Sequence, residues 1–316
     1  MSQLEILKEA VAKALPDLDL VLGWRQGINI LRTAPFIIRS AKDLDNLVWN
    51  RLCVNNLSSQ LMHLRDKRVG ILVKGCDSRS VVQLLQEKLI SRESVKVFGL
   101  PCTGVVDLKK LSRSVDLDRV EAAVVTERTL ELSADQGSLS LPLPEVLADK
   151  CLVCKYPNPV IHDALIGEPV EPWAPAELPA QAAFAAMPLA ERFAYWREQM
   201  DRCIRCYACR NSCPMCFCKD VCLGDSRDPH WQSQETSVRE KWMFQLIHAM
   251  HLAGRCTGCG ECERACPVGI PLLTMKRELN AITQDLFGYE AGVDPAATPP
   301  LMTFAVVEEK IKESEW

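Results

Sequence analysis

The chain has 316 residues, of which 48% are hydrophobic and 25% are charged, and its formal net charge is −4. This length suffices for two domains, and the slightly acidic balance excludes the basic surface with which proteins bind nucleic acid. No apolar stretch approaches the roughly 18 residues of a transmembrane helix. Residues 4–15 have apolar side chains at helical spacing with Glu5 and Glu9 among them, which predicts an amphipathic helix and not a targeting segment. We therefore expect a cytoplasmic protein, in a compartment where disulfides are rare.

Residues 1–166 alternate the patterns of strands and helices. The predicted strands are 20–24, 35–39, 68–75 and 95–100, and the predicted helices are 41–64 and 78–90. The strand–helix–strand unit at 68–100 implies a parallel pair with a right-handed crossover. Residues 122–134 are expected to add strands at one edge. This region is therefore predicted to be an α/β domain with a partly parallel sheet.

Residues 167–187 are rich in proline and alanine and are predicted to form a linker. Three helical patterns follow it, at 188–200, 237–254 and 267–288. They predict an α-helical domain over 188–288. Residues 289–316 form a tail with an amphipathic end, which is expected to dock either on a neighbouring chain or on the protein's own surface.

The helical region carries one cysteine pattern twice. The spacing C-x2-C-x2-C-x3-C-P occupies 203–214 and recurs at 256–267. This is the ferredoxin spacing, in which three thiolates hold one 4Fe–4S cluster and the fourth holds the other cluster. Zinc sites use pairs of C-x2-C instead of such triplets. Two clusters with crosswise ligands are predicted, the first on Cys203, Cys206, Cys209 and Cys266, and the second on Cys256, Cys259, Cys262 and Cys213.

Four cysteines of the α/β region predict a third 4Fe–4S cluster. Cys76 and Cys102 each follow a strand of the parallel pair, so both thiols are expected at the carboxyl edge of the sheet, where such sheets bind ligands. Cys151 and Cys154 add a C-x2-C pair on a loop. For each of these four the alternative is a buried, inert thiol. Cys53 is predicted to lie in the core, on the apolar side of a helix.

Three further thiols, Cys216, Cys218 and Cys222, leave several alternatives open. They are expected to lend a ligand to the third cluster, to hold an extra cluster with a thiol from a partner, or to pack in the interior. The histidines are scattered, and each is predicted to be structural or at the surface. They are His63, His162, His230, His248 and His251.

The segment KGCDSRS joins a predicted strand to a predicted helix. Asp77 or Ser78 is expected to cap a helix that begins near Arg79. The free amides there, together with Lys74 and Arg79, suit a phosphate group. The alternative is an N-cap flanked by surface charges. No G-x-G-x-x-G motif supports a dinucleotide independently.

The motifs VKGCDSRSVVQLLQE, VFGLPCTGVVD, CLVCKYP and RCIRCYACRNSCPMCFC together resemble the beta-subunit family of deazaflavin-coenzyme-reducing hydrogenases and formate dehydrogenases. Residues 188–288 resemble the α-helical ferredoxin domain of succinate dehydrogenase and heterodisulfide reductase subunits. The resemblance implies FAD beside a 4Fe–4S cluster in the α/β domain, and other subunits of an oxidoreductase complex as partners. Two features depart from the family: the α/β segment is short, and the dicluster motif follows it instead of preceding it.

Three functions are compatible with these features. The expected one is a flavin-bearing iron–sulfur subunit of an anaerobic oxidoreductase complex, which passes electrons between clusters and a two-electron carrier. The alternative is a wiring subunit with clusters but no flavin. A structural scaffold is disfavoured, because paired ferredoxin motifs form an electron path. No acid–base pair or nucleophile suited to a carbon substrate is evident.

Overall fold

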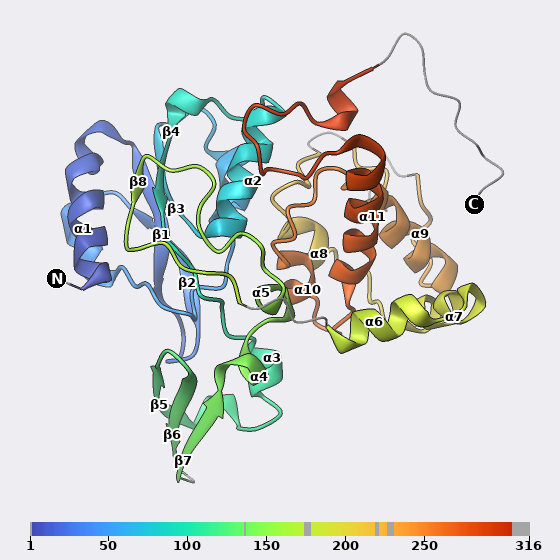
Figure 1. Cartoon of the computed structure of the whole chain (residues 1–316), viewed down its shortest axis with the longest axis horizontal. Helices are drawn as coiled ribbons and strands as arrows, with labels where there is room; N and C mark the ends of the chain where they lie inside the picture. Colours follow the sequence, from blue (N-terminus) through green and yellow to red (C-terminus); the bar gives the residue numbers. More distant parts are fainter. Residues whose placement is uncertain (1, 136, 174–177, 219–220, 226–230, 305–316) are drawn as a thin grey trace.

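The computed structural model describes residues 2–135, 137–173, 178–218, 221–225 and 231–304. It contains an α/β region and a helical region that packs beside it (Figure 1). Within the described residues, no helix is long and apolar enough to cross a membrane. The predicted fold class, a partly parallel α/β region followed by a helical region, is confirmed.

The α/β region is built on a five-stranded mixed sheet. Its strands, in spatial order, are β2 (Thr33–Ile38), β1 (Leu20–Gln26), β3 (Val69–Val73), β4 (Val95–Gly99) and β8 (Ala164–Leu165). Only the β1–β2 pair is antiparallel. Helix α2 (Gly75–Gln86) makes the predicted crossover between β3 and β4, and α1 (Gln3–Ala14) covers the opposite face (Figure 1). Every residue of β3 is buried, because both faces of this central strand are covered.

Two predictions for the α/β region were wrong. Residues 41–64 form two short 3-10 helices, η2 (Ala41–Asn46) and η3 (Leu57–His63), instead of one α-helix. Between them the side chains of Asn50 and Asn56 accept hydrogen bonds from nearby backbone amides, at 2.8 and 3.1 Å, which competes with helix formation. Cys53 is fully buried, as predicted, but on this irregular segment instead of a helix.

The second error concerns residues 122–134. They do not extend the main sheet but belong to a separate antiparallel meander of β5 (Val120–Val125), β6 (Thr129–Ala134) and β7 (Gly137–Pro142). Its buried face packs on the short helices α3 (Leu108–Leu111) and α4 (Leu143–Val146) as a core of its own. Short connections between neighbouring strands favour this local pairing over a distant one.

The helical region contains the three helices that its periodicity predicted. They are α7 (Leu189–Asp201), α9 (Val238–Met250) and α11 (Leu272–Phe287), and the short helices α8 (Ala208–Asn211) and α10 (Glu261–Ala265) follow the two cysteine loops. Helix α9 has the predicted cap, since the Ser237 side chain accepts a hydrogen bond from the Glu240 amide. Helix α11 begins later than expected, after Pro271. A further helix, α6 (Pro179–Ala186), lies within the segment predicted to be a linker.

Helix α2 joins the two regions. Glu87, at its end, accepts two hydrogen bonds of 2.7 Å from the guanidinium of Arg255, which also lies over the ring of Phe217. On the same helix Arg79 donates to the Ala291 carbonyl, and Ser80 lies 2.9 Å from the Thr257 hydroxyl. The side chains of Arg255 and Glu87 are only 14% and 11% exposed, so water does little to screen this pair.

We predict that Glu87→Ala lowers the free energy of unfolding by about 3 kcal/mol, because it leaves the Arg255 guanidinium buried without its counter-charge. The measurement is urea unfolding of the protein purified without oxygen. Glu93→Ala is the matched control, since Glu93 is exposed and its replacement should cost no more than about 0.5 kcal/mol. Equal effects of the two variants would contradict this assignment.

Candidate metal centres and a thiol-lined cavity

The first predicted set of ligands surrounds one small cavity. Its four thiols come from the loop before α8, from α8 itself and from the end of α10, and Phe244 and Ile270 also line the cavity. The thiols are those of Cys203, Cys206, Cys209 and Cys266. Three are buried, and Cys206 is exposed. We call these four cysteines the first set.

Nitrogen donors point at the sulfurs of the first set. The amides of Arg205 and Ile270 lie 3.4 Å from the sulfurs of Cys203 and Cys266, respectively. The side-chain amide of Gln245 lies 3.9 Å from the Cys203 sulfur and 3.7 Å from the Cys209 sulfur. Such donors stabilise negative charge on sulfur and tune the potential of an iron–sulfur cluster. The site therefore fits a group whose thiolate ligands carry negative charge.

The second predicted set is also brought together, by the contact between α8 and α10. Cys256, Cys259 and Cys262 come from the loop that leads into α10, and Cys213 comes from the chain after α8. Burial, together with the nearby Cys213, raises the pKa of Cys259 and of Cys262 to about 12. Gly258 and Gly260 turn this loop with φ of +68° and +72°, which other residues rarely adopt. These four cysteines are the second set.

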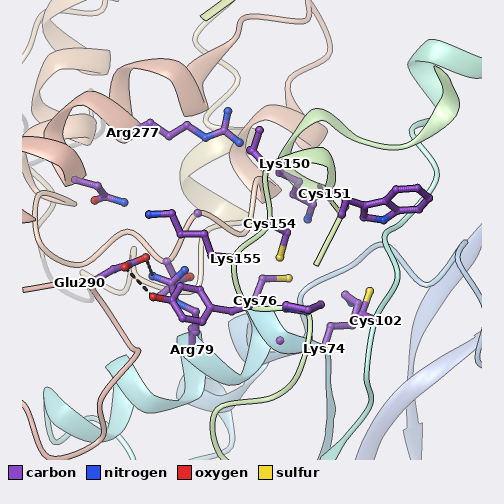
Figure 2. A pocket seen from close by; sticks show the side chains of 18 of the residues that line it. Lys74, Cys76, Arg79, Cys102, Lys150, Cys151, Cys154, Lys155, Arg277 and Glu290 are labelled. Atoms are coloured by element: carbon purple, nitrogen blue, oxygen red, sulfur yellow. Dashed lines mark hydrogen bonds and ion pairs between the residues drawn. The ribbon is translucent and has the colours of Figure 1, made fainter. Parts of the chain in front are cut away.

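Cys76, Cys102, Cys151 and Cys154 line a cavity of about 750 Å³ at the carboxyl edge of the sheet. Figure 2 shows the thiols of Cys76, Cys102 and Cys154 directed into this common space. Cys151 lies in α5 (Asp149–Leu152) and accepts a hydrogen bond from the Val105 amide at 3.4 Å. Burial raises the pKa of Cys102 to about 12, and the neighbouring Cys151 adds to this effect. These four cysteines are the third set.

Both regions of the chain contribute to the wall of this cavity. Lys155 comes from the α/β region, and Arg277 comes from α11 of the helical region (Figure 2). Trp173, from the segment between the two regions, also lines the cavity. Thr257 and Gly258, in the loop of the second set, also line it. The cavity is therefore adjacent to the second set, and its size is that of a small-molecule site.

The residues predicted to hold a phosphate are largely engaged with the protein itself. Helix α2 begins at Gly75 and not near Arg79, and the Asp77 carboxylate caps this start by accepting a hydrogen bond from the Lys74 amide at 3.3 Å. The absence of a side chain at Gly75 admits the Tyr156 carbonyl, which would lie 1.9 Å from a β-carbon there. Lys74 is the N-cap residue and pairs with Asp77 at 2.7 Å. Ser78 donates to the Gly75 carbonyl at 2.8 Å and accepts from the Val160 amide at 2.9 Å. Lys74 and Arg79 line the cavity, whereas Asp77 and Ser78 are not among its lining residues.

The remaining thiols lie elsewhere. Cys216 and Cys218 line a second open cavity, together with Cys213 and Arg210, and none of the three surplus thiols is among the residues around the cavity of the third set. Cys213 donates a hydrogen bond to Cys216, which is the main cause of the lowered pKa of Cys216. All sixteen cysteines are free thiols. The geometry therefore separates this group from the third set.

The sequence analysis did not predict that four polar residues lie beside the thiol sets. Lys150 lies in α5, and Gln245, His248 and Lys276 are buried on α9 and α11. His248 was predicted to be structural or at the surface, and it is 5% exposed. A signal existed for Lys276, which lies three and four residues after Leu273 and Leu272 and so falls on the apolar face of its helix.

Three comparisons bear on the predicted resemblance. Residues 199–270 match the family described as 4Fe-4S dicluster domain. An F420-dependent formate dehydrogenase subunit beta from Methanocaldococcus jannaschii is 22% identical, over 89% of this chain and 89% of that protein. An F420-dependent formate dehydrogenase 1 subunit beta from Methanococcus maripaludis is 24% identical, over 90% of this chain and 88% of that protein.

Among solved structures, a chain of the F420-reducing NiFe hydrogenase complex from Methanosarcina barkeri matches 48% of this chain and 61% of its own length, at 18% identity. Its TM-score of 0.38 is too low to establish a common fold. The resemblance rests instead on the two sequence relatives and on the dicluster match. It is confirmed: the chain is similar along nearly its whole length to formate dehydrogenase beta subunits, and it carries a 4Fe-4S dicluster domain at residues 199–270.

Proposed function

We propose that this chain is an iron–sulfur electron-transfer subunit of a cytoplasmic oxidoreductase complex, with 4Fe–4S clusters on all three thiol sets and a flavin in the large cavity. The main observation in support is the spatial order of the three thiol sets, in which the second set lies between the third and the first. The loop of the second set lines the cavity of the third, and its α10 leads directly to Cys266 of the first. Closely spaced clusters in one protein serve to move electrons, and the names of the relatives are those of subunits of such complexes.

The two ends of this row differ in their surroundings. The third set lies in an open cavity of small-molecule size, whereas the first set is closed except at Cys206, which is exposed. We assign the cavity end to exchange with a two-electron carrier and the Cys206 end to exchange with another subunit. The proposed division of the chain is 1–166 for the α/β domain, 167–187 for the linker, 188–288 for the dicluster domain and 289–316 for the tail.

The cavity suits a flavin in its charge and in its walls. Lys155, Arg277 and Arg79 place cationic groups around it, and Trp173 and Tyr156 add aromatic surface. Cationic side chains are suited to the phosphates of FAD. A bound flavin would supply interconversion of two-electron and one-electron transfer. The chain's own residues would bind it, orient it against the third set and exclude water.

The alternative is a wiring subunit with three clusters and no flavin. It is favoured by the engagement of Asp77 and Ser78 in the start of α2, which leaves them no part in holding a phosphate. In this alternative the cavity holds only the third cluster.

We predict about 12 irons and one flavin per chain in protein purified without oxygen, because three four-iron clusters and one cavity are proposed. Iron is counted colorimetrically, and the flavin is released with acid and identified by fluorescence and chromatography. About 12 irons without flavin would favour the wiring alternative. Fewer than about 6 irons in fully loaded protein would contradict both.

We predict that Cys102→Ala removes about 4 irons and leaves the C-terminal pair of clusters intact, because Cys102 belongs only to the third set. The measurement is iron content together with the electron paramagnetic resonance (EPR) spectrum of the reduced protein. Cys53→Ala is the matched control, since Cys53 is buried outside the three sets and its loss should leave the iron unchanged. Unchanged iron in Cys102→Ala would refute the placement of the third cluster.

A further inference from the structure

Two lysines lie between consecutive thiol sets. Lys276, on α11, is 2% exposed and lies beside His248 of α9, and one turn further along α11 Asn280 contacts the loop of the second set. Lys150 lines the cavity of the third set, and its ammonium group donates to the carbonyl of Cys259 in the second set. A buried lysine is rare unless it is paired with opposite charge. The position of Lys276 therefore needs a source of negative charge, and thiolate sets provide one, whereas Lys150 is partly exposed in the cavity.

Lys276 reaches the first set through a chain of hydrogen bonds. Its Nζ lies 3.4 Å from His248 Nε2, and His248 Nδ1 lies 3.5 Å from Gln245 Oε1. An ammonium group can only donate, so His248 accepts at Nε2 and carries its proton at Nδ1. Gln245 then accepts from His248 and turns its NH2 group toward the sulfurs of Cys203 and Cys209. Every donor in the chain thus points from the lysine toward the first set.

The same face of α11 lies against the second set, because Asn280, one turn after Lys276, donates a hydrogen bond to the Cys256 carbonyl at 2.8 Å. The Lys276 side chain is buried there. The same burial, with Lys276 beside it, lowers the pKa of His248 well below its ordinary value, so His248 is neutral. The positive charge of this buried group therefore resides on Lys276.

Lys150 has the equivalent position between the second and the third set. Lys150 lines the cavity beside Cys76 and Cys151, and its ammonium group donates to the Cys259 carbonyl. Room for its stem is made by Gly260, where a β-carbon would lie 2.7 Å from the Lys150 Cδ. Glu261 is not free to neutralise it fully, because both of its oxygens accept from Arg264, at 2.9 and 2.8 Å.

We propose that Lys150 and Lys276 are shared counter-charges, each of which raises the reduction potentials of the two clusters that it joins. An electron added to a cluster adds negative charge, and a fixed cation in a poorly screened interior stabilises that reduced form. Because one cation serves two neighbouring clusters, it shifts both potentials in the same direction and keeps them close to each other. This inference rests on the proposed function, since it requires clusters on the three sets.

The test is a mediated redox titration, followed by EPR, of full-length Lys276→Met and Lys150→Met loaded with iron. Methionine keeps the length of the stem and removes the charge. Lys276→Met should lower the equilibrium constant for reduction of the first and second clusters at least tenfold, which is about 59 mV for one electron, and leave the third unchanged. Lys150→Met should shift the second and third clusters and leave the first unchanged. Cys102→Ala identifies the signal of the third cluster.

The controls separate charge from hydrogen bonding. Lys109→Met is matched, because Lys109 also donates to a carbonyl of a cluster loop, that of Cys266 at 2.6 Å, but it is exposed and screened by water. Lys109→Met should change the equilibrium constant for reduction of every cluster by less than tenfold. Gln245→Leu removes the donors to Cys203 and Cys209 and should lower only the potential of the first cluster.

The inference would be overturned if both methionine variants retain their iron and their equilibrium constants for reduction lie within twofold of those of the unmodified protein. An equal shift in Lys109→Met would also overturn it. If Lys276→Met does not retain its iron, an unshifted first cluster in fully loaded Gln245→Leu would overturn the relay from Lys276, and Lys150→Met still tests the shared charge. Failure of the proposed function is distinct, because unmodified protein would then lack the clusters before any variant is made.

Discussion

The cost of burying thiolates away from water is the constraint on which this structure depends. Burial raises the pKa of Cys102, Cys209 and Cys259 to about 12, far above that of a thiol in water. A thiolate in such a place is tolerated only if its charge is spread over bound metal, hydrogen-bond donors and nearby cations. The chain places amides, Gln245 and two lysines around these sulfurs, so the polar groups of its interior are concentrated where the thiols are. Cys203, Cys209, Cys262 and Cys266 themselves belong to the apolar core of the helical region.

The fold meets this constraint by joining its two regions at the thiols. Helix α2 starts where β3 ends, which puts Cys76 at the edge of the sheet, and its outer side contacts the helical region through Arg79, Ser80 and Glu87. The second set then lies against the cavity of the third. The same helix thus positions a candidate ligand and fixes the distance between two candidate centres. A change in the packing of α2 would alter both together.

Much of the candidate site was predictable because it is encoded in short segments. The two cysteine loops are local motifs, and a strand followed by a cysteine places that thiol at a known edge of a parallel sheet. The errors arose where side chains or distant segments decide the backbone. Asn50 and Asn56 replace helical hydrogen bonds within 41–64, and the Asp77 carboxylate caps α2 at the Lys74 amide, so that the helix starts at Gly75. The contact between Lys276 and His248 depends on how α9 and α11 pack, and no pattern within either helix specifies that partner. The division of the cysteines into three sets was therefore accessible from spacing, whereas the cations between the sets were not.

The neutral His248 explains why a lysine occupies this position and not a second histidine. A histidine in this buried place is neutral, as His248 is, because burial lowers its pKa, and it offers a cluster no positive charge. Lys276, whose pKa is raised above its ordinary value, keeps its proton. His248 instead serves as a polar link, because its two nitrogens face a donor on one side and an acceptor on the other. The interior thus separates two tasks: Lys276 supplies a constant charge, and the amide of Gln245 delivers its effect to the sulfurs without carrying a charge of its own.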